Sequence, residues 1–134
     1  MNKEDAYNLL INFLGEFPNI VIVKQFIKDF SDILNNQAKG SEKKLLTGLM
    51  TLLKQVKEYG YKIVTINGHE QLKNYNSLMS LHLRGKTYNV RILATIKNDI
   101  VYFLLAFDEK SGKKSSDYSN YANIALKRLE QINS

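Results

Sequence analysis

Hydrophobic residues recur every three or four positions in four segments of the chain, which is the spacing of one buried face of an α-helix. The first segment ends before Pro18, a residue that is typical of helix boundaries. Two further segments cover 25–35 and 41–59, and Ser41 is placed to cap the second. Because the break between them is short, they predict an antiparallel helical hairpin. The fourth segment begins near Asp117 and predicts a C-terminal helix.

Alternating polar and hydrophobic residues predict β-strands in the second half of the chain. In the segment 79–84, the polar residues Ser80, His82 and Arg84 share one face, and the hydrophobic residues between them share the other. The next segment carries Arg91, which projects to the same side as His82 if the register of the two strands allows it.

Turn residues and β-branched runs complete the expected order of elements. Gly85 and Lys86 predict a two-residue turn between the two strands. The segment 100–107 is hydrophobic throughout, which predicts a central strand covered on both faces. The run 20–23 predicts a short strand, and 63–66 is compatible with another. The C-terminal half is therefore expected to form an antiparallel meander.

The composition is that of a folded, basic domain. The chain has 134 residues, of which 44% are hydrophobic and 24% charged, and its net charge is +6. This charge favours an anionic partner, such as nucleic acid or an acidic protein. The absence of cysteine excludes disulfides, thiolate metal sites and a cysteine nucleophile, and two histidines are too few for a His-rich metal site. No metal and no cofactor are expected.

The chain contains no hydrophobic run near the ~18 residues that span a membrane. Its first residues lack the charged-then-hydrophobic order of a signal peptide. These features predict a cytoplasmic protein with no membrane partner.

The stretch 71–98 contains five basic residues and no acidic residue. Two of the three arginines, Arg84 and Arg91, lie in it, although the chain has sixteen lysines. Arginine binds phosphate through a fork of N–H donors, whereas lysine acts as a point charge. The nearby His82 is suited to general acid–base catalysis near neutral pH, and arginine stabilises the charge that develops on a phosphate. These residues predict a phosphate-handling face, with a solvated basic hairpin as the alternative.

Other candidates for contacts with a nucleic acid lie nearer the C-terminus. Lys110 and Lys113 lie in a polar loop and are placed to bind phosphates, although solubility is the usual reason for such a loop. Tyr118 and Tyr121 are suited to stacking on bases, with packing against the core as the alternative. His69 is isolated in the sequence and is given no role.

The order of the elements and several short motifs together resemble the RelE/ParE superfamily of toxins from bacterial type II toxin–antitoxin pairs, in its HigB-like, phage Gp49-like branch. The similarity covers roughly residues 20–132. It is carried by LMSLHLR at 78–84, VRI at 90–92, the hydrophobic strand 100–107, EKSGK at 109–113 and ALKRL at 125–129.

The resemblance implies an α+β fold in which a curved, mostly antiparallel sheet packs against an N-terminal helical hairpin and a C-terminal helix. Residues 1–134 would form this single domain, with 1–18 as an additional N-terminal helix. The resemblance also implies cleavage of mRNA without a metal ion, on the ribosome, by attack of a ribose 2′-hydroxyl on the adjacent phosphate. A cognate antitoxin protein would neutralise the toxin by covering it.

The resemblance also assigns roles to particular residues. Arg91 matches the family's strand arginine and would stabilise the phosphate, and Arg84 and His82 would complete the catalytic set. The residues expected to contact RNA are Lys86, Lys110, Lys113, Tyr118 and Tyr121. Ser80, His82 and Glu109 depart from the family pattern. Two alternatives therefore stay open: a ParE-type gyrase inhibitor of the same fold, and a basic domain that binds an acidic protein.

Overall fold

The computed structural model describes residues 3–36, 38, 40–66, 68–75, 77–109 and 115–133. Within these residues the chain forms helices and strands in the following order: α1 (Lys3–Leu14), β1 (Ile20–Ile22), α2 (Lys24–Asn36), α3 (Glu42–Tyr59), the 3-10 helix η1 (Gly60–Thr65), β2 (Glu70–Gln71), β3 (Met79–Arg84), β4 (Asn89–Lys97), β5 (Ile100–Asp108) and α4 (Ser115–Asn133).

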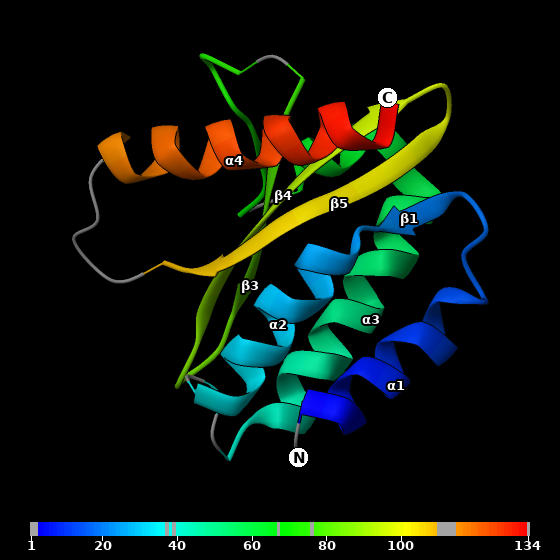
Figure 1. Ribbon diagram of the computed structural model, residues 1–134, viewed down its shortest axis with the longest axis vertical. Coiled ribbons are helices and arrows are strands. Elements are labelled where there is room, and N and C mark those ends of the chain that lie inside the picture. The colour runs from blue at the N-terminus through cyan, green and yellow to red at the C-terminus, as the bar shows by residue number, and fades with distance from the viewer. Residues whose placement is uncertain are drawn as a thin grey trace.

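The strands form one five-stranded sheet in the order β1-β5-β4-β3-β2 (Figure 1). Only β1 and β5 run parallel, and the other neighbours are antiparallel. Because β3, β4 and β5 are consecutive in both sequence and space, the expected meander is confirmed. The fold is α+β, with a mixed and mostly antiparallel sheet.

Helices cover both faces of the sheet. In Figure 1, β5 runs between α4 on one side and the group of α1, α2 and α3 on the other. Phe26 of α2 packs edge-on against Phe103 of β5, with 5.7 Å between the ring centroids. Phe107 of the same strand stacks on Tyr121 of α4 at 3.9 Å. A strand covered on both faces needs hydrophobic residues at every position, which explains the unbroken hydrophobic run of β5.

A β-bulge lets β5 supply aromatic rings to both layers of helices. The register of β4 against β5 shifts between Leu93 and Ala94, so that Leu104 is an extra residue on β5. Side chains alternate between the two faces of a regular strand, and Phe103 and Phe107 would then share a face. The extra residue moves Phe103 to the opposite face from Phe107.

The N-terminal helix packs on the helical hairpin formed by α2 and α3, which run antiparallel as expected (Figure 1). Leu10 of α1 is 3% exposed and belongs to the main core. The rings of Phe13 and Phe17 lie 5.6 Å apart and continue this contact into the loop before β1. Three large hydrophobic residues of α1 are exposed: Tyr7, Leu9 and Ile11.

Two expectations for the region around α3 are wrong. The segment 63–66 is not a strand, because α3 ends at Tyr59 and the chain continues as η1 through Thr65. Gly60 has a φ of 54°, a backbone conformation that glycine adopts readily, and it breaks the α-helical path. Ser41 precedes α3, but its side chain makes no capping hydrogen bond.

The turn between β3 and β4 lies one residue later than the sequence predicts. The Gly85 N–H donates to the carbonyl oxygen of Tyr88 at 2.9 Å, so Lys86 and Thr87 form the tip. A Cβ atom on Gly85 would lie 2.4 Å from the Tyr88 ring. Gly85 is therefore needed as the partner of an aromatic residue across the hairpin, and not as a turn residue.

An ion pair completes the exposed edge of β5. Strand β1 pairs with β5 only as far as Phe103. Beyond this point, the carbonyl oxygen of Leu104 accepts a hydrogen bond from Arg128 Nη1 at 2.8 Å. The Ala106 N–H donates to Asp29 Oδ2 at 3.2 Å, and Asp29 and Arg128 pair with each other at 2.7 Å. We call Asp29 and Arg128 the β5-edge clamp, because they satisfy backbone groups that a neighbouring strand would otherwise satisfy.

Loss of the β5-edge clamp should destabilise the protein. Arg128→Ala should lower the free energy of unfolding by about 2–3 kcal/mol, because it leaves the Asp29 carboxylate and the Leu104 carbonyl without their charged donor. Urea unfolding followed by circular dichroism measures this change. The control, Lys127→Ala, removes the same charge at an exposed position of α4 and should change stability by less than about 0.5 kcal/mol. Equal effects of the two variants would contradict the role of the clamp.

Candidate functional site

The register of the β3–β4 hairpin places His82 directly opposite Arg91. Residues directly opposite each other in an antiparallel pair project to the same face of the sheet. Arg91 in turn pairs with Phe107, whose ring contacts α4, so both side chains lie on the α4 face. A two-residue turn one position earlier would have paired His82 with Asn89 instead. Either position of the turn places His82 and Arg91 on the same face, and the true position brings them directly opposite each other.

The side chain of Asn89 makes two hydrogen bonds, one to the imidazole of His82 and one to the backbone of Glu109. His82 Nε2 is hydrogen-bonded to Asn89 Oδ1. Asn89 Nδ2 donates to the backbone carbonyl of Glu109 at 2.8 Å. On its other side, His82 faces Gly68, and a Cβ atom built there would lie 3.8 Å from His82 Nδ1. The ring is thus fixed between the end of β5 and the loop before β2.

The guanidinium of Arg91 already binds two acceptors. Its Nε donates to Glu109 Oε1 at 3.2 Å, and its Nη1 donates to the carbonyl oxygen of Gly68 at 2.8 Å. The side chain is 15% exposed and that of Glu109 is 22% exposed. Within the described part of the chain, Nη2 has no hydrogen-bond partner. Arg91 therefore keeps free donors, but a carboxylate occupies one side of its fork.

His69 belongs to this site, although no pattern in the sequence indicates it. Its Nδ1 accepts a hydrogen bond from the backbone N–H of His82 at 3.0 Å. Burial, and then the positive charges of His82 and Arg91, lower the pKa of His69 below its ordinary value of 6.5. The contact depends on β2, which has only two residues and no recognisable periodicity. The one local signal was the glycine beside it, since Gly68 has a φ of 98°.

The two tyrosines at the start of α4 pack against the sheet. The hydroxyls of Tyr118 and Ser80 are hydrogen-bonded at 2.8 Å, and burial raises the pKa of Tyr118 to about 12. Tyr121 stacks flat on Phe107, with 9° between the ring planes. Ser80 is fully buried under α4, so the polar face of β3 opens to solvent only toward the hairpin tip. A role of either tyrosine in stacking on bases stays a prediction.

The remaining predicted residues lie toward the tip of the hairpin or beyond the described chain. Arg84 and Lys86 are exposed and line a shallow groove of about 340 Å³, together with Asn89 and Glu109. Arg84 pairs with Asn89 across the hairpin, which places it on the same face as His82, nearer the tip. Lys110 and Lys113 lie outside the described residues. The structure thus brings together His82 and Arg91, adds His69, Asn89 and Glu109, and keeps Arg84 at the margin.

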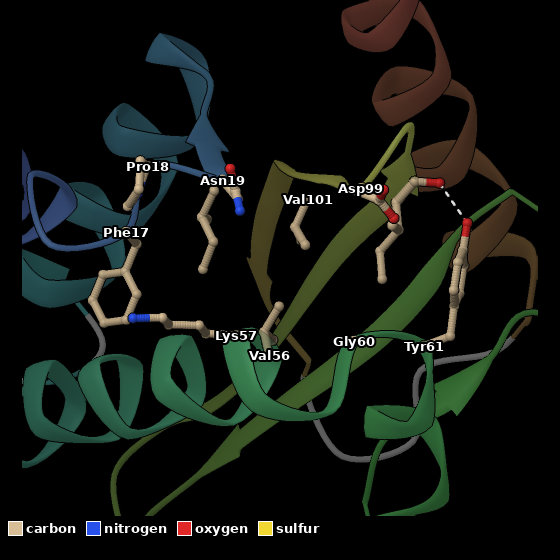
Figure 2. A pocket seen from close by; sticks show the side chains of 11 residues that line it. Phe17, Pro18, Asn19, Val56, Lys57, Gly60, Tyr61, Asp99 and Val101 are labelled. Atoms are coloured by element: carbon tan, nitrogen blue, oxygen red, sulfur yellow. Dashed lines mark hydrogen bonds between the residues drawn. The ribbon is translucent and has the colours of Figure 1, made fainter.

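A second hollow lies at the opposite end of β4 (Figure 2). It has a volume of about 230 Å³ and is bordered by the loop before β1, the end of α3 and the turn after β4. Its lining includes two charged residues, Lys57 and Asp99. Lys57 extends along the wall, with its ammonium 5.9 Å from the centre of the Phe17 ring. Tyr61 closes one side by donating to the carbonyl oxygen of Ile96 at 2.6 Å. Because this hollow contains no histidine or arginine, the hairpin face is the stronger candidate for chemistry.

The stability of the protein should depend on pH through His69. In the folded protein the pKa of this imidazole is lowered, whereas the unfolded chain takes up a proton near pH 6.5. The free energy of unfolding should therefore fall as the pH is lowered from 6.5 toward the lower pKa of the folded state, and this contribution should be constant above about pH 7. His69→Asn keeps an oxygen that can accept the His82 N–H but does not titrate. Urea unfolding between pH 5 and 8 should show a weaker pH dependence for this variant, and parallel curves would contradict the assignment.

Comparison of the chain with protein-family models, curated proteins and solved structures found no match. Among the helices that the structure describes, none is both long and hydrophobic enough to cross a membrane. The described residues also contain no group of three or more His, Cys, Asp or Glu side chains that could hold a metal ion. Membership of the toxin superfamily therefore stays a prediction, and function is argued below from the geometry of the site.

Proposed function

We propose that the protein is the toxin of a type II toxin–antitoxin pair and that it cleaves mRNA on the ribosome without a metal ion. The position of His82 directly opposite Arg91, with His69 against the backbone of His82, carries this proposal. Cleavage by a ribose 2′-hydroxyl needs a base for the hydroxyl proton and a cation for the charge that develops on the phosphate. An imidazole and a guanidinium side by side supply both groups.

The reaction assigns one task to each residue. The imidazole of His82 takes the proton of the 2′-hydroxyl as the 2′-oxygen forms a bond to phosphorus. Arg91 donates hydrogen bonds to the phosphate oxygens, on which negative charge increases in the transition state. The bond from phosphorus to the 5′-oxygen then breaks, and the 5′-oxygen takes up a proton. The products are a 2′,3′-cyclic phosphate and a 5′-hydroxyl end.

The charge around the site supports an anionic ligand. Arg84 and Lys86 are exposed at the hairpin tip, where Asp108 and Glu109 also line the groove, and the whole chain has a net charge of +6. Such a surface attracts the RNA backbone at a distance. It is also suited to an acidic antitoxin that covers the same face and blocks access to His82.

A second candidate is favoured by the ion pair between Arg91 and Glu109. A carboxylate that already neutralises the guanidinium competes with phosphate for it. In this alternative the protein does not cleave RNA and acts by binding, either as a ParE-type inhibitor of gyrase or as a basic domain for an acidic protein. The two candidates differ in whether cells that express the protein accumulate cleaved mRNA or show a DNA-damage response.

Substitution of Arg91 should abolish most of the cleavage. Arg91→Ala should lower the rate of mRNA cleavage in a translation extract by about 10²-fold or more, because it removes the donors that stabilise the phosphate. The control, Lys97→Ala, removes the same charge at the exposed far end of β4 and should keep nearly full activity. Thermal unfolding of both variants checks that they are folded. Full growth inhibition by Arg91→Ala would show that this site is not responsible for toxicity.

Substitution of Glu109 should strengthen the binding of RNA. Glu109→Gln keeps an oxygen beside Arg91 Nε but removes the negative charge, so a phosphate competes more easily for the guanidinium. The affinity for a 2′-deoxy RNA analogue that cannot be cleaved should rise roughly fivefold, which corresponds to about 1 kcal/mol. Glu130→Gln, which makes the same charge change at an exposed position of α4, is the control for net charge. Equal gains for both variants in a fluorescence-anisotropy titration would refute a specific role of Glu109.

A further inference from the structure

The side-chain amide of Asn89 has only one orientation that satisfies its neighbours. Its Nδ2 lies 2.8 Å from the backbone carbonyl oxygen of Glu109. A carbonyl oxygen can only accept a hydrogen bond, so the nitrogen of the amide must face it. The amide oxygen of Asn89 therefore faces His82 Nε2.

This orientation determines which nitrogen of His82 carries the proton. The Asn89 Oδ1 atom can only accept, so the Nε2 that contacts it must be the donor. A neutral imidazole carries one proton, and the lone pair then lies on Nδ1. The hydrogen bonds thus favour one tautomer of His82 over the other.

Gly68 lies beside His82 Nδ1, the nitrogen that carries the lone pair. A Cβ atom built at position 68 would lie 3.8 Å from Nδ1, so the glycine keeps a side chain from packing against this nitrogen. Gly68 has a φ of 98°, which side-chain-bearing residues rarely adopt, so the backbone itself requires glycine there. In the described part of the chain, no group donates a hydrogen bond to this nitrogen.

In the neighbouring His69, Nδ1 is the nitrogen that is already hydrogen-bonded, and Nε2 is the other ring nitrogen. Its Nδ1 lone pair accepts the His82 backbone N–H, so its Nε2 carries the proton when the ring is neutral. A neutral His69 therefore has no lone pair left to act as a base. It can only donate a hydrogen bond, for example to a phosphate oxygen. The two histidines are not interchangeable.

We propose that Asn89 is a positioning residue that holds His82 as the Nε2–H tautomer, so that Nδ1 is the atom that takes the proton of the 2′-hydroxyl. This proposal rests on RNA cleavage as the function of the site. The proton moves from the 2′-oxygen to Nδ1 as the 2′-oxygen bonds to phosphorus. It then passes from Nδ1 to the 5′-oxygen as the bond from phosphorus to that oxygen breaks. Asn89 keeps its hydrogen bond to Nε2 throughout and touches no reacting atom.

Two substitutions separate this role from simple support of the loop. Asn89→Asp keeps an oxygen facing His82 Nε2 but loses the donor to the Glu109 carbonyl, whereas Asn89→Ala loses both. If Asn89 sets the tautomer, only Asn89→Ala should lose the preference for Nε2–H. If it merely holds Glu109 in place, the two variants should behave alike.

The tautomer is measured directly by ¹⁵N NMR of the imidazole nitrogens at a pH where the rings are neutral. In the full-length wild-type protein and in Asn89→Asp, we expect His82 to be protonated on Nε2. In Asn89→Ala, we expect a mixture of tautomers. We also expect kcat for RNA cleavage to fall at least about tenfold in Asn89→Ala, with a much smaller change in KM, because binding of RNA does not need the base. The amide spectrum shows whether each variant is folded.

The outcomes separate this inference from the proposed function. Protonation of His82 on Nδ1 in the wild type, or equal tautomer ratios and equal kcat values in all three proteins, would overturn the role of Asn89 even if the protein cleaves RNA. A wild-type protein that shows the Nε2–H tautomer but cleaves no RNA would overturn the proposed function and with it the catalytic role of Asn89. The combination of an Nε2–H tautomer, cleavage by the wild type and a loss confined to Asn89→Ala would support both.

Discussion

The contact between Gly85 and the ring of Tyr88 sets the register of β3 and β4, and the site depends on that register. A Cβ atom at position 85 would lie 2.4 Å from the ring, so only glycine allows the ring to lie across the hairpin at this point. If the turn moved by one residue, every pair across the hairpin would move by two, and Arg91 would no longer face His82. The meeting of imidazole and guanidinium therefore depends on a residue that lies outside the site and has no side chain of its own.

The parts of this structure that follow from local periodicity could be predicted from the sequence. The helices, the meander and the shared face of Ser80, His82 and Arg84 all depend on repeats of 3.6 or 2 residues. The parts that depend on contacts between distant segments could not. His69 reaches His82 across 13 residues, and Glu109 reaches Arg91 across 18. The position of the turn was missed because a glycine between two strands indicates a turn, whereas here it makes room for an aromatic ring.

Two of the three arginines are used in the same way, although they lie in different parts of the fold. Arg91 joins a carboxylate of Glu109 to a backbone carbonyl, and Arg128 does the same with Asp29 and Leu104. A guanidinium can donate in two directions at once, which a lysine ammonium on a flexible stem does less precisely. Arg91 and Arg128 therefore lie where a side chain connects two elements, whereas Arg84 is exposed at the hairpin tip. A phosphate that binds Arg91 has to enter an arrangement that already has a structural use.

The β5-edge clamp also determines how another protein can attach to this one. One edge of the sheet ends in β2, which has only two residues, and the other is β1 followed by the backbone groups bonded to Asp29 and Arg128. In the described part of the chain both edge strands are short, and backbone groups of β5 beyond β1 are already bonded to Asp29 and Arg128. Short and occupied edges disfavour growth of the sheet by strand addition. A protein that covers the hairpin face must recognise it through side chains, and its specificity can then be changed one residue at a time.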